Sequence, residues 1–313
     1  MAQVYVDDIV FGATIDAWAI EFSKEMMKEF EMSMVGKLTF FLGLQVKQKK
    51  EGIFISQEKY ARNIVKKFGL DFKKHASTPM SSSTKLNVDS SRVEVSPTLY
   101  RSIIGSLLYL TASRLDIAFS VGVRARYQPP LKESHLTMVE RIIRYVNGTP
   151  NYGLWYLKDS NACFAGYSNV DWVGSVDDRK STSGGCFYLG NNLISWMNKK
   201  QNFMSLSTVE AEYIAARSCC TQLLWMKKLL HDYEIPQDTM CVFCDNTSAI
   251  NLSKNPVQHS KSKHIEIRYH FIRDLMEDKV VCLEFIHTDN QKANISGPRF
   301  ESLCKTIGVG TIS

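Results

Sequence analysis

The stretch STVEAEYIAARSCCTQL, residues 207–223, carries the strongest helical signal in the sequence. Apolar side chains recur in it at helical spacing and form one stripe: Val209, Tyr213, Ala216, Cys220 and Leu223. Ser207 is a suitable N-cap residue, and Glu210 is placed to complete a capping box. We therefore expect a helix that begins directly after Ser207 and packs its apolar stripe against a neighbouring layer.

Strand-like segments flank this helix on both sides. Extended candidates come before it at 153–157, 163–167, 186–189 and 193–197, with a polar loop at 177–185. After it come a strand at 240–244, a basic helix from about residue 264 to residue 279, and a strand at 280–287. This order predicts an α/β (α+β) fold, a mixed sheet with helices on both faces.

The chain before residue 153 has a different pattern. The expected elements are a β-hairpin at 1–12, a helix at 15–30, a buried strand at 38–46, a strand at 52–56, and helices at 57–68, 99–110 and 134–146. Ser, Thr and Pro are frequent in residues 76–98, which predicts a polar linker. The expected division is therefore 1–75, the linker 76–98, a helical segment 99–152, and the mixed sheet 153–313.

Composition narrows the class of protein. The chain has 313 residues, a net charge of +6 and eight Cys, which is too few for a disulfide scaffold. No apolar run approaches the roughly 18 residues of a membrane span, and the first ten residues lack the basic start of a secretory signal. We expect an intracellular protein, cytoplasmic or nuclear, that is not secreted and not in a membrane. The small positive excess weakly favours a polyanionic partner.

Two pairs of carboxylates are candidate metal ligands. Asp7 and Asp8 lie at the tip of the expected hairpin, and adjacent carboxylates repel unless a cation such as Mg²⁺ lies between them. Their apolar flanks predict that the two strands are buried. Glu212 lies early in the strong helix and Asp245 ends a strand, so the two can converge on one metal. The alternative for each pair is a set of ordinary solvated surface acids.

A zinc site is a weaker hypothesis. Cys241 and Cys244, followed by His259 and His264, match the spacing of a two-Cys, two-His finger. We reject this hypothesis because Cys241 and Cys244 lie in an expected strand, where positions i and i+3 point to opposite faces.

Basic side chains supply a candidate surface for phosphate contacts. They are Arg179, Lys180, Lys199, Lys200, Lys261, Lys263 and Arg268. From charge alone, a solvated helix face explains the last three equally well.

Seven motifs, in this order and spacing, resemble the C-terminal part of the Pol polyprotein of copia-type LTR retrotransposons. They are Tyr5-Val6-Asp7-Asp8, Phe41-Leu42-Gly43, Tyr100 to Leu110, Asp178 to Gly184, Glu210 to Ala215, Cys244-Asp245-Asn246 and Lys263-His264-Ile265. The resemblance implies a truncated reverse transcriptase palm and a thumb-to-connection segment, followed by a ribonuclease H domain. It implies Mg²⁺ as cofactor and an RNA–DNA hybrid or other nucleic acid as partner.

The resemblance also reveals departures from the family. The ribonuclease H family holds two Mg²⁺ ions with four acids, which fall here at Asn169, Glu212, Asp245 and Asn294. Two of the four are therefore uncharged, and the segment after Asn294 is altered as well. We expect hybrid cleavage to be impaired, and DNA synthesis to be absent because the polymerase also needs a carboxylate from an earlier motif. The alternatives are an active ribonuclease H in which Asp171 replaces Asn169, and a catalytically dead nucleic-acid-binding module.

Overall fold

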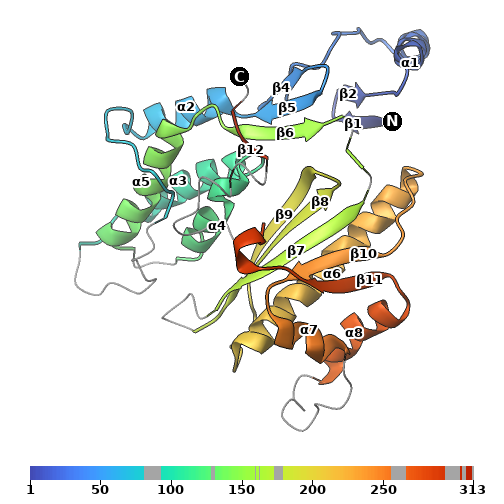
Figure 1. The fold of residues 1–313 in the computed structure, drawn as a ribbon. Coiled ribbons are helices and arrows are strands. Elements are labelled where there is room, and N and C mark those ends of the chain that lie inside the picture. Colours follow the sequence, from blue (N-terminus) through green and yellow to red (C-terminus); the bar gives the residue numbers. More distant parts are fainter. Residues whose placement is uncertain are drawn as a thin grey trace.

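The computed structural model describes residues 1–80, 93–127, 131–158, 160–161, 163–172, 179–254, 266–292, 304 and 308–311. For residues 266–270 and 289 it describes the backbone only. The fold is a mixed α/β arrangement with three separate sheets (Figure 1). Among the described residues, no helix combines the length and the apolar character needed to cross a bilayer.

The N-terminal hairpin and the helix after it form as expected. Strands β1 (Ala2–Tyr5) and β2 (Asp8–Phe11) pair antiparallel, and helix α1 (Asp16–Glu29) follows. The expected burial of the hairpin is wrong, since Val4 is 68% exposed. The reason is that β1 and β2 make a two-stranded sheet, and no third strand in the described part of the chain joins it.

The second sheet has five strands in the order β12-β6-β5-β4-β3. They are β3 (Phe40–Phe41), β4 (Leu44–Gln48), β5 (Gly52–Ser56), β6 (Gly153–Leu157) and β12 (Val309–Gly310). The single strand expected at 38–46 is wrong, because a tight turn divides it into β3 and β4. Leu42 and Gly43 both have positive φ, 47° and 78°, which ends one strand and starts the next antiparallel to it.

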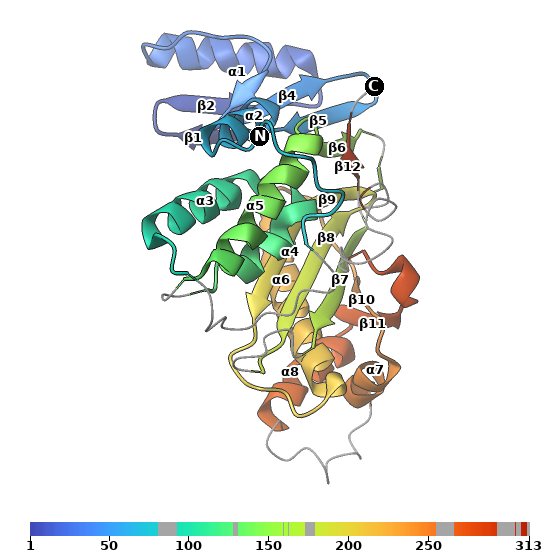
Figure 2. The same cartoon turned by 90° about the vertical axis from the view of Figure 1, so that its left-hand side faces the viewer.

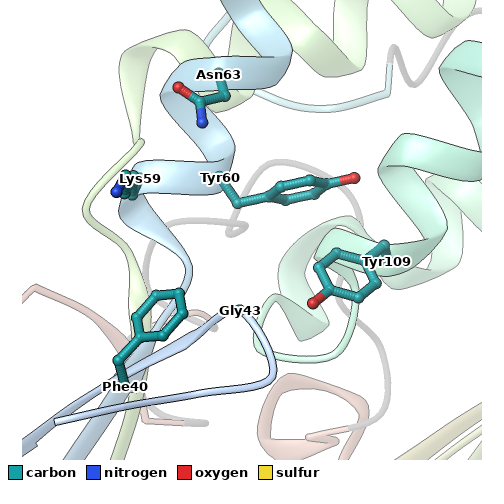
Figure 3. Close-up of a pocket in the computed structure, with 6 residues that line it drawn as sticks. All are labelled: Phe40, Gly43, Lys59, Tyr60, Asn63 and Tyr109. Carbon is teal, nitrogen blue, oxygen red and sulfur yellow. The ribbon is translucent and has the colours of Figure 1, made fainter.

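This turn gives a first prediction, that Gly43→Ala costs about 1–3 kcal/mol of unfolding free energy. A Cβ atom at Gly43 would overlap the hydroxyl of Tyr109, in the pocket that both residues line (Figure 3). The same hydroxyl donates a hydrogen bond to the Leu42 carbonyl over 2.6 Å, so it cannot move away freely. The matched control is Gly105→Ala, where an added Cβ meets no atom within 4 Å. Urea unfolding should show no loss at Gly105, and equal losses at both sites would contradict the prediction.

Four helices from the part of the chain before residue 153 pack against one another. They are α2 (Glu58–Lys67), α3 (Pro97–Leu110), α4 (Leu115–Arg124) and α5 (Glu133–Gly148). Sequence periodicity predicts α2, α3 and α5 but not α4. The described ends of the expected linker are held in place, since the Val95 N–H donates to the Leu131 carbonyl over 2.9 Å and Arg141 donates to Thr78. The middle of that linker, 81–92, lies outside the described residues.

The third sheet has the order β11-β10-β7-β8-β9 and mixes parallel with antiparallel pairs, as expected. Its strands are β7 (Phe164–Asp171), β8 (Thr182–Leu189), β9 (Asn192–Lys200), β10 (Met240–Cys244) and β11 (Val281–Phe285). Its helices are α6 (Thr208–Asp232), α7 (Thr247–Lys254) and α8 (Glu266–Glu277), and α7 was not expected. The expected loop 177–185 is too long, because β8 begins at Thr182.

The expected start of this sheet at residue 153 does not match the strand pairing. Strand β6 pairs with β5 and β12 in the second sheet, so 153–157 joins the N-terminal part of the chain. The third sheet begins with β7.

Helices cover both faces of the third sheet, in two hydrophobic cores. Phe187 belongs to the core under α6, while its neighbours Cys186 and Tyr188 belong to the core shared with α3, α4 and α5. Helix α4 lies against β9 on that second face (Figure 2). The expectation of helices on both faces is confirmed, but the second face is covered by a helix from outside 153–313.

Candidate functional site

Two hydrogen bonds cap the N-terminus of helix α6. The Ser207 hydroxyl accepts a hydrogen bond from the Glu210 N–H over 3.2 Å, and Glu210 Oε2 accepts one from the Leu206 N–H over 2.8 Å. The expected capping box is therefore present in a shifted form, with its return bond to Leu206. This start sets which side of α6 faces the sheet and buries Glu212 there.

Glu212 meets the end of strand β10. Ligand atoms of Glu212, Cys244 and Asp245 all lie within 4.8 Å of one another. Cys244 is the last residue of β10 and points to the α6 side, and Asp245 follows it directly. The structure thus brings together the two carboxylates that the sequence selected, and adds a thiol that it did not.

The surroundings of Glu212 and Asp245 favour binding of a cation. Burial, and after it the nearby Asp245 carboxylate, raise the pKa of Glu212 to about 8, against a hydrogen bond from the Val170 backbone that lowers it. Glu212 Oε2 is buried and accepts no hydrogen bond from the described residues. Asp245 Oδ2 accepts one from the Thr288 hydroxyl over 2.9 Å. A buried, unpaired carboxylate oxygen beside a second acid is the donor set of a hard cation.

Strand β7 runs beside β10 and carries Asn169, one of the two uncharged residues among the four positions named above. Tyr167 is paired with Phe243 in parallel register, so Asn169 and Asp245 each lie two residues further along neighbouring strands. Asn169 is described and belongs to this end of the sheet, whereas Asn294 lies outside the described residues.

Asp171 is not in the carboxylate group. It is paired across the strands with Thr182, whose hydroxyl accepts a hydrogen bond from Arg126 over 2.6 Å. Burial raises the pKa of Asp171, and the charge of Arg126, just beyond the end of α4, lowers it, so Asp171 lies near Arg126. Among the described residues, Asp171 shares no three-ligand group with Glu212 and Asp245.

Two further residues near the site were not predicted as site residues from the sequence. Gln291 is fully buried and its side-chain amide donates to the Ser168 carbonyl over 2.8 Å. Thr288 holds Asp245, as described above. Both follow β11 and have no local motif, so only the tertiary fold could reveal them. Cys244 was named from the sequence only in the rejected zinc spacing and in the motif that it shares with Asp245.

Four of the candidate cationic residues gather at the same end of the sheet. Lys200 is paired with Thr182 and Lys199 with Ser183, and Arg179 and Lys180 lead directly into β8. Because β8 starts opposite the end of β7, these residues share the sheet end at which Asp245 lies. Lys261 and Lys263 lie outside the described residues, and the side chain of Arg268 on α8 is not described.

The other pair of candidate acids, Asp7 and Asp8, does not belong to the group of Glu212 and Asp245. Asp7 lies in the turn between β1 and β2, Asp8 begins β2, and both are exposed. This confirms the expected hairpin tip. In the described chain, no group of three ligands includes either residue.

The two-Cys, two-His spacing does not correspond to one metal site. Cys244 groups with Glu212 and Asp245, whereas Cys241 groups with Cys282 and Glu284 on the other face of the sheet. The two cysteines therefore do not share a site, as the strand argument predicts. His259 and His264 lie outside the described residues.

The raised pKa of Glu212 predicts a pH dependence of stability. In the unfolded chain Glu212 ionises near 4.5, and in the metal-free fold near 8. The folded state then holds the extra proton, so its stabilising effect is complete below pH 4.5 and is lost as the pH rises through 8. We expect a fall of up to about 1.4 kcal/mol per pH unit within that window, absent in Glu212→Gln. Urea unfolding in a chelating buffer checks this, and parallel curves for the two proteins would contradict it.

Comparison with known proteins agrees with these features. Residues 1–82 match the family described as reverse transcriptase (RNA-dependent DNA polymerase). The chain is 34% identical over 312 residues to the retrovirus-related Pol polyprotein from transposon RE1 of Arabidopsis thaliana, covering 98% of this chain and 21% of that protein. It is 32% identical over 318 residues to the Pol polyprotein from transposon TNT 1-94 of Nicotiana tabacum, covering 97% and 24%.

A shorter relative is covered nearly completely. The uncharacterized mitochondrial protein AtMg00810 of Arabidopsis thaliana is 34% identical over 224 residues, which cover 71% of this chain and 92% of that protein. Among solved structures, the N-terminal RNase H domain of rv2228c from Mycobacterium tuberculosis covers 47% of this chain at 8% identity. Its TM-score of 0.32 is too low to carry an argument. The chain spans about a fifth of the length of the Pol relatives. By this similarity over nearly its whole length, the chain belongs to the family of copia-type retrotransposon Pol polyproteins.

Proposed function

We propose that the chain joins the end of a reverse transcriptase to a ribonuclease H-like domain whose hybrid-cleaving site is impaired. The observation that carries this proposal is the convergence of Glu212 and Asp245 at one end of the third sheet. In the proposed division, 1–75 is the palm remnant, 76–98 the linker and 99–152 the thumb-to-connection segment. The ribonuclease H-like domain is 153–313, although β6 pairs with the N-terminal sheet.

The site fits one divalent cation better than two. Glu212 Oε2 and the Asp245 carboxylate would hold Mg²⁺, and Thr288 orients the second of them. A bound Mg²⁺ would stabilise the charge that develops on the scissile phosphate. Asn169 offers an oxygen at this sheet end without a charge, so two-metal chemistry lacks part of its negative ligand set. Weak metal binding and poor cleavage follow.

An RNA–DNA hybrid is the proposed partner. Arg179, Lys180, Lys199 and Lys200 place four cationic side chains at the sheet end that holds the acids. Contacts of this kind bind phosphates without reading sequence. The same observation favours the second candidate function, a nucleic-acid-binding module without cleavage. The third reading, in which Asp171 restores activity, is less well supported because Asp171 lies toward Arg126.

A cleavage assay on the full chain tests the proposal. With an RNA–DNA hybrid and Mg²⁺, we expect slow cleavage or none, and Glu212→Gln removes whatever cleavage remains. Hybrid binding should persist in Glu212→Gln and weaken in Lys199→Gln/Lys200→Gln, with a smaller salt dependence. Rapid Mg²⁺-dependent cleavage by the unmodified chain would overturn the impaired site, and binding unaffected by the two Lys changes would overturn the proposed surface.

We further propose that these 313 residues alone do not synthesise DNA. Asp7 and Asp8 supply one metal-binding motif of the polymerase, and two-metal chemistry requires ligands from a second motif that the resemblance places upstream of Tyr5. Primer extension on an RNA template above the level of Asp7→Asn would contradict this.

A further inference from the structure

A second group of metal-ligating side chains lies on the face of the third sheet opposite α6. Cys241 on β10 and Cys282 on β11 are directly paired across two parallel strands. Glu284 lies two residues beyond Cys282 on β11, so its side chain shares the same face. The ligand atoms of all three lie within 4.8 Å of one another.

The spacing of these atoms is that of a tetrahedral metal site. The Cys241 and Cys282 thiols both approach Glu284 Oε1, over 3.6 Å and 3.7 Å. Zinc–sulfur bonds of about 2.3 Å and zinc–oxygen bonds of about 2.1 Å, at the tetrahedral angle, separate S and O by about 3.6 Å. The strand register therefore holds each thiol at the sulfur–oxygen separation of such a site, with the two sulfur atoms within 4.8 Å of each other.

The donor set differs from that of the acid pair. Two sulfur ligands and one oxygen favour a borderline or soft ion such as Zn²⁺ over Mg²⁺, which prefers oxygen alone. Cys241 and Cys282 are partly exposed and Glu284 is exposed, so an ion can enter from solvent. This group shares no residue with the group of Glu212, Cys244 and Asp245. Along the chain, Phe243 separates Cys241 from Asp245, and its ring stacks on Tyr167.

We propose that Cys241, Cys282 and Glu284 bind a divalent cation of the Zn²⁺ class, with the fourth position open to water. Two metal–sulfur bonds and one metal–oxygen bond form, the two thiol protons pass to solvent, and no electrons are transferred. The ion clamps the edge strand β11 to β10. Since β11 leads directly to Thr288 and Gln291, the clamp also holds the segment that supports Asp245 and Ser168.

The test uses the full chain, reduced with a non-thiol reductant, and Co²⁺ as a spectroscopic stand-in for Zn²⁺. We expect one Co²⁺ per chain with a thiolate charge-transfer band that Zn²⁺ displaces. Cys241→Ser and Cys282→Ser should each weaken the affinity at least about 100-fold, beyond the loss that follows removal of supporting partners around a ligand. Glu284→Gln tests the oxygen ligand with both thiols kept. The matched controls are Cys163→Ser, which changes an exposed thiol at the start of β7, and Cys244→Ser in the acid group.

A stability measurement gives the second readout. Zn²⁺ should raise the unfolding temperature of the unmodified chain and of Cys163→Ser, and should leave that of Cys282→Ser unchanged. Co²⁺ spectra that survive both Cys241→Ser and Cys282→Ser would overturn the proposal, as would a band lost in either control. Absence of any Co²⁺ or Zn²⁺ binding by the reduced chain would overturn it as well.

Discussion

Replacement of Asp116 by Ala is expected to lower the free energy of unfolding by about 3–5 kcal/mol. Asp116 and Arg114 form an ion pair at the start of α4, with 2.7 Å between Arg114 Nη2 and Asp116 Oδ2, and neither side chain is more than 1% exposed. Burial lowers the pKa of Arg114, but Asp116 and Tyr145 raise it by more, so the guanidinium stays charged. Removal of Asp116 therefore leaves a buried charge without its partner.

The same pair connects α4 to α5. Tyr145 donates a hydrogen bond to Asp116 Oδ2 over 2.8 Å, and Arg114 donates to the Thr149 carbonyl over 2.8 Å. Loss of Asp116 thus loosens the helix that covers the second face of the third sheet. We expect the unfolding of the whole chain, followed by urea titration, to shift to lower denaturant.

Two controls separate the buried charge from a general loss of contacts. Glu94→Gln breaks the pair with Lys132, whose atoms are 3.1 Å apart and in which the Glu94 side chain is 70% exposed, and should cost less than about 1 kcal/mol. Arg114→Met combined with Asp116→Leu removes both charges and should recover most of the loss. A cost for Asp116→Ala no larger than that of Glu94→Gln would contradict the argument.

The helix that this pair anchors also shows where sequence reasoning ends. Helix α6 was predicted because its cap and apolar stripe are local features. Helix α4 was missed because eight of its ten residues are buried, including Asp116 and Arg124, and a helix without a polar face has no amphipathic period. The pairing of β6 with β5 was missed because a strand's own residues do not specify its partner.

The candidate metal-binding residues also divide into those that the sequence predicts and those that only the fold reveals. Glu212 and Asp245 were predicted because their motifs survive in order along the chain. Cys241 and Cys282 were not paired in advance, since their meeting depends on the register of two strands that are about forty residues apart. Thr288 and Gln291 likewise reach Asp245 and Ser168 only through the fold.

The last prediction concerns restored charge at the acid site. Asn169→Asp combined with Asn294→Asp is expected to raise Mg²⁺-dependent hybrid cleavage about 100-fold. Two unit charges about 4 Å apart interact by about 4 kcal/mol at an effective dielectric of 20, so a gain of about 1.4 kcal/mol, or tenfold, for each restored carboxylate is modest. Asn169 lies at the correct sheet end, two residues beyond the pair formed by Tyr167 and Phe243.

The expected gain in cleavage should be accompanied by a change in the stability of the fold. Without metal, the carboxylate added by Asn169→Asp at the sheet end that holds Glu212, whose pKa is already raised to about 8, should destabilise the fold. With Mg²⁺ the double variant should gain more stability than the unmodified chain. Asn251→Asp, at an exposed position on α7, adds one charge elsewhere and should change neither property. Glu212→Gln in the double variant should abolish the restored cleavage. No added stabilisation by Mg²⁺ would contradict the charge argument, whereas stabilisation without cleavage would assign the remaining defect to the altered segment from Ser296 to Arg299.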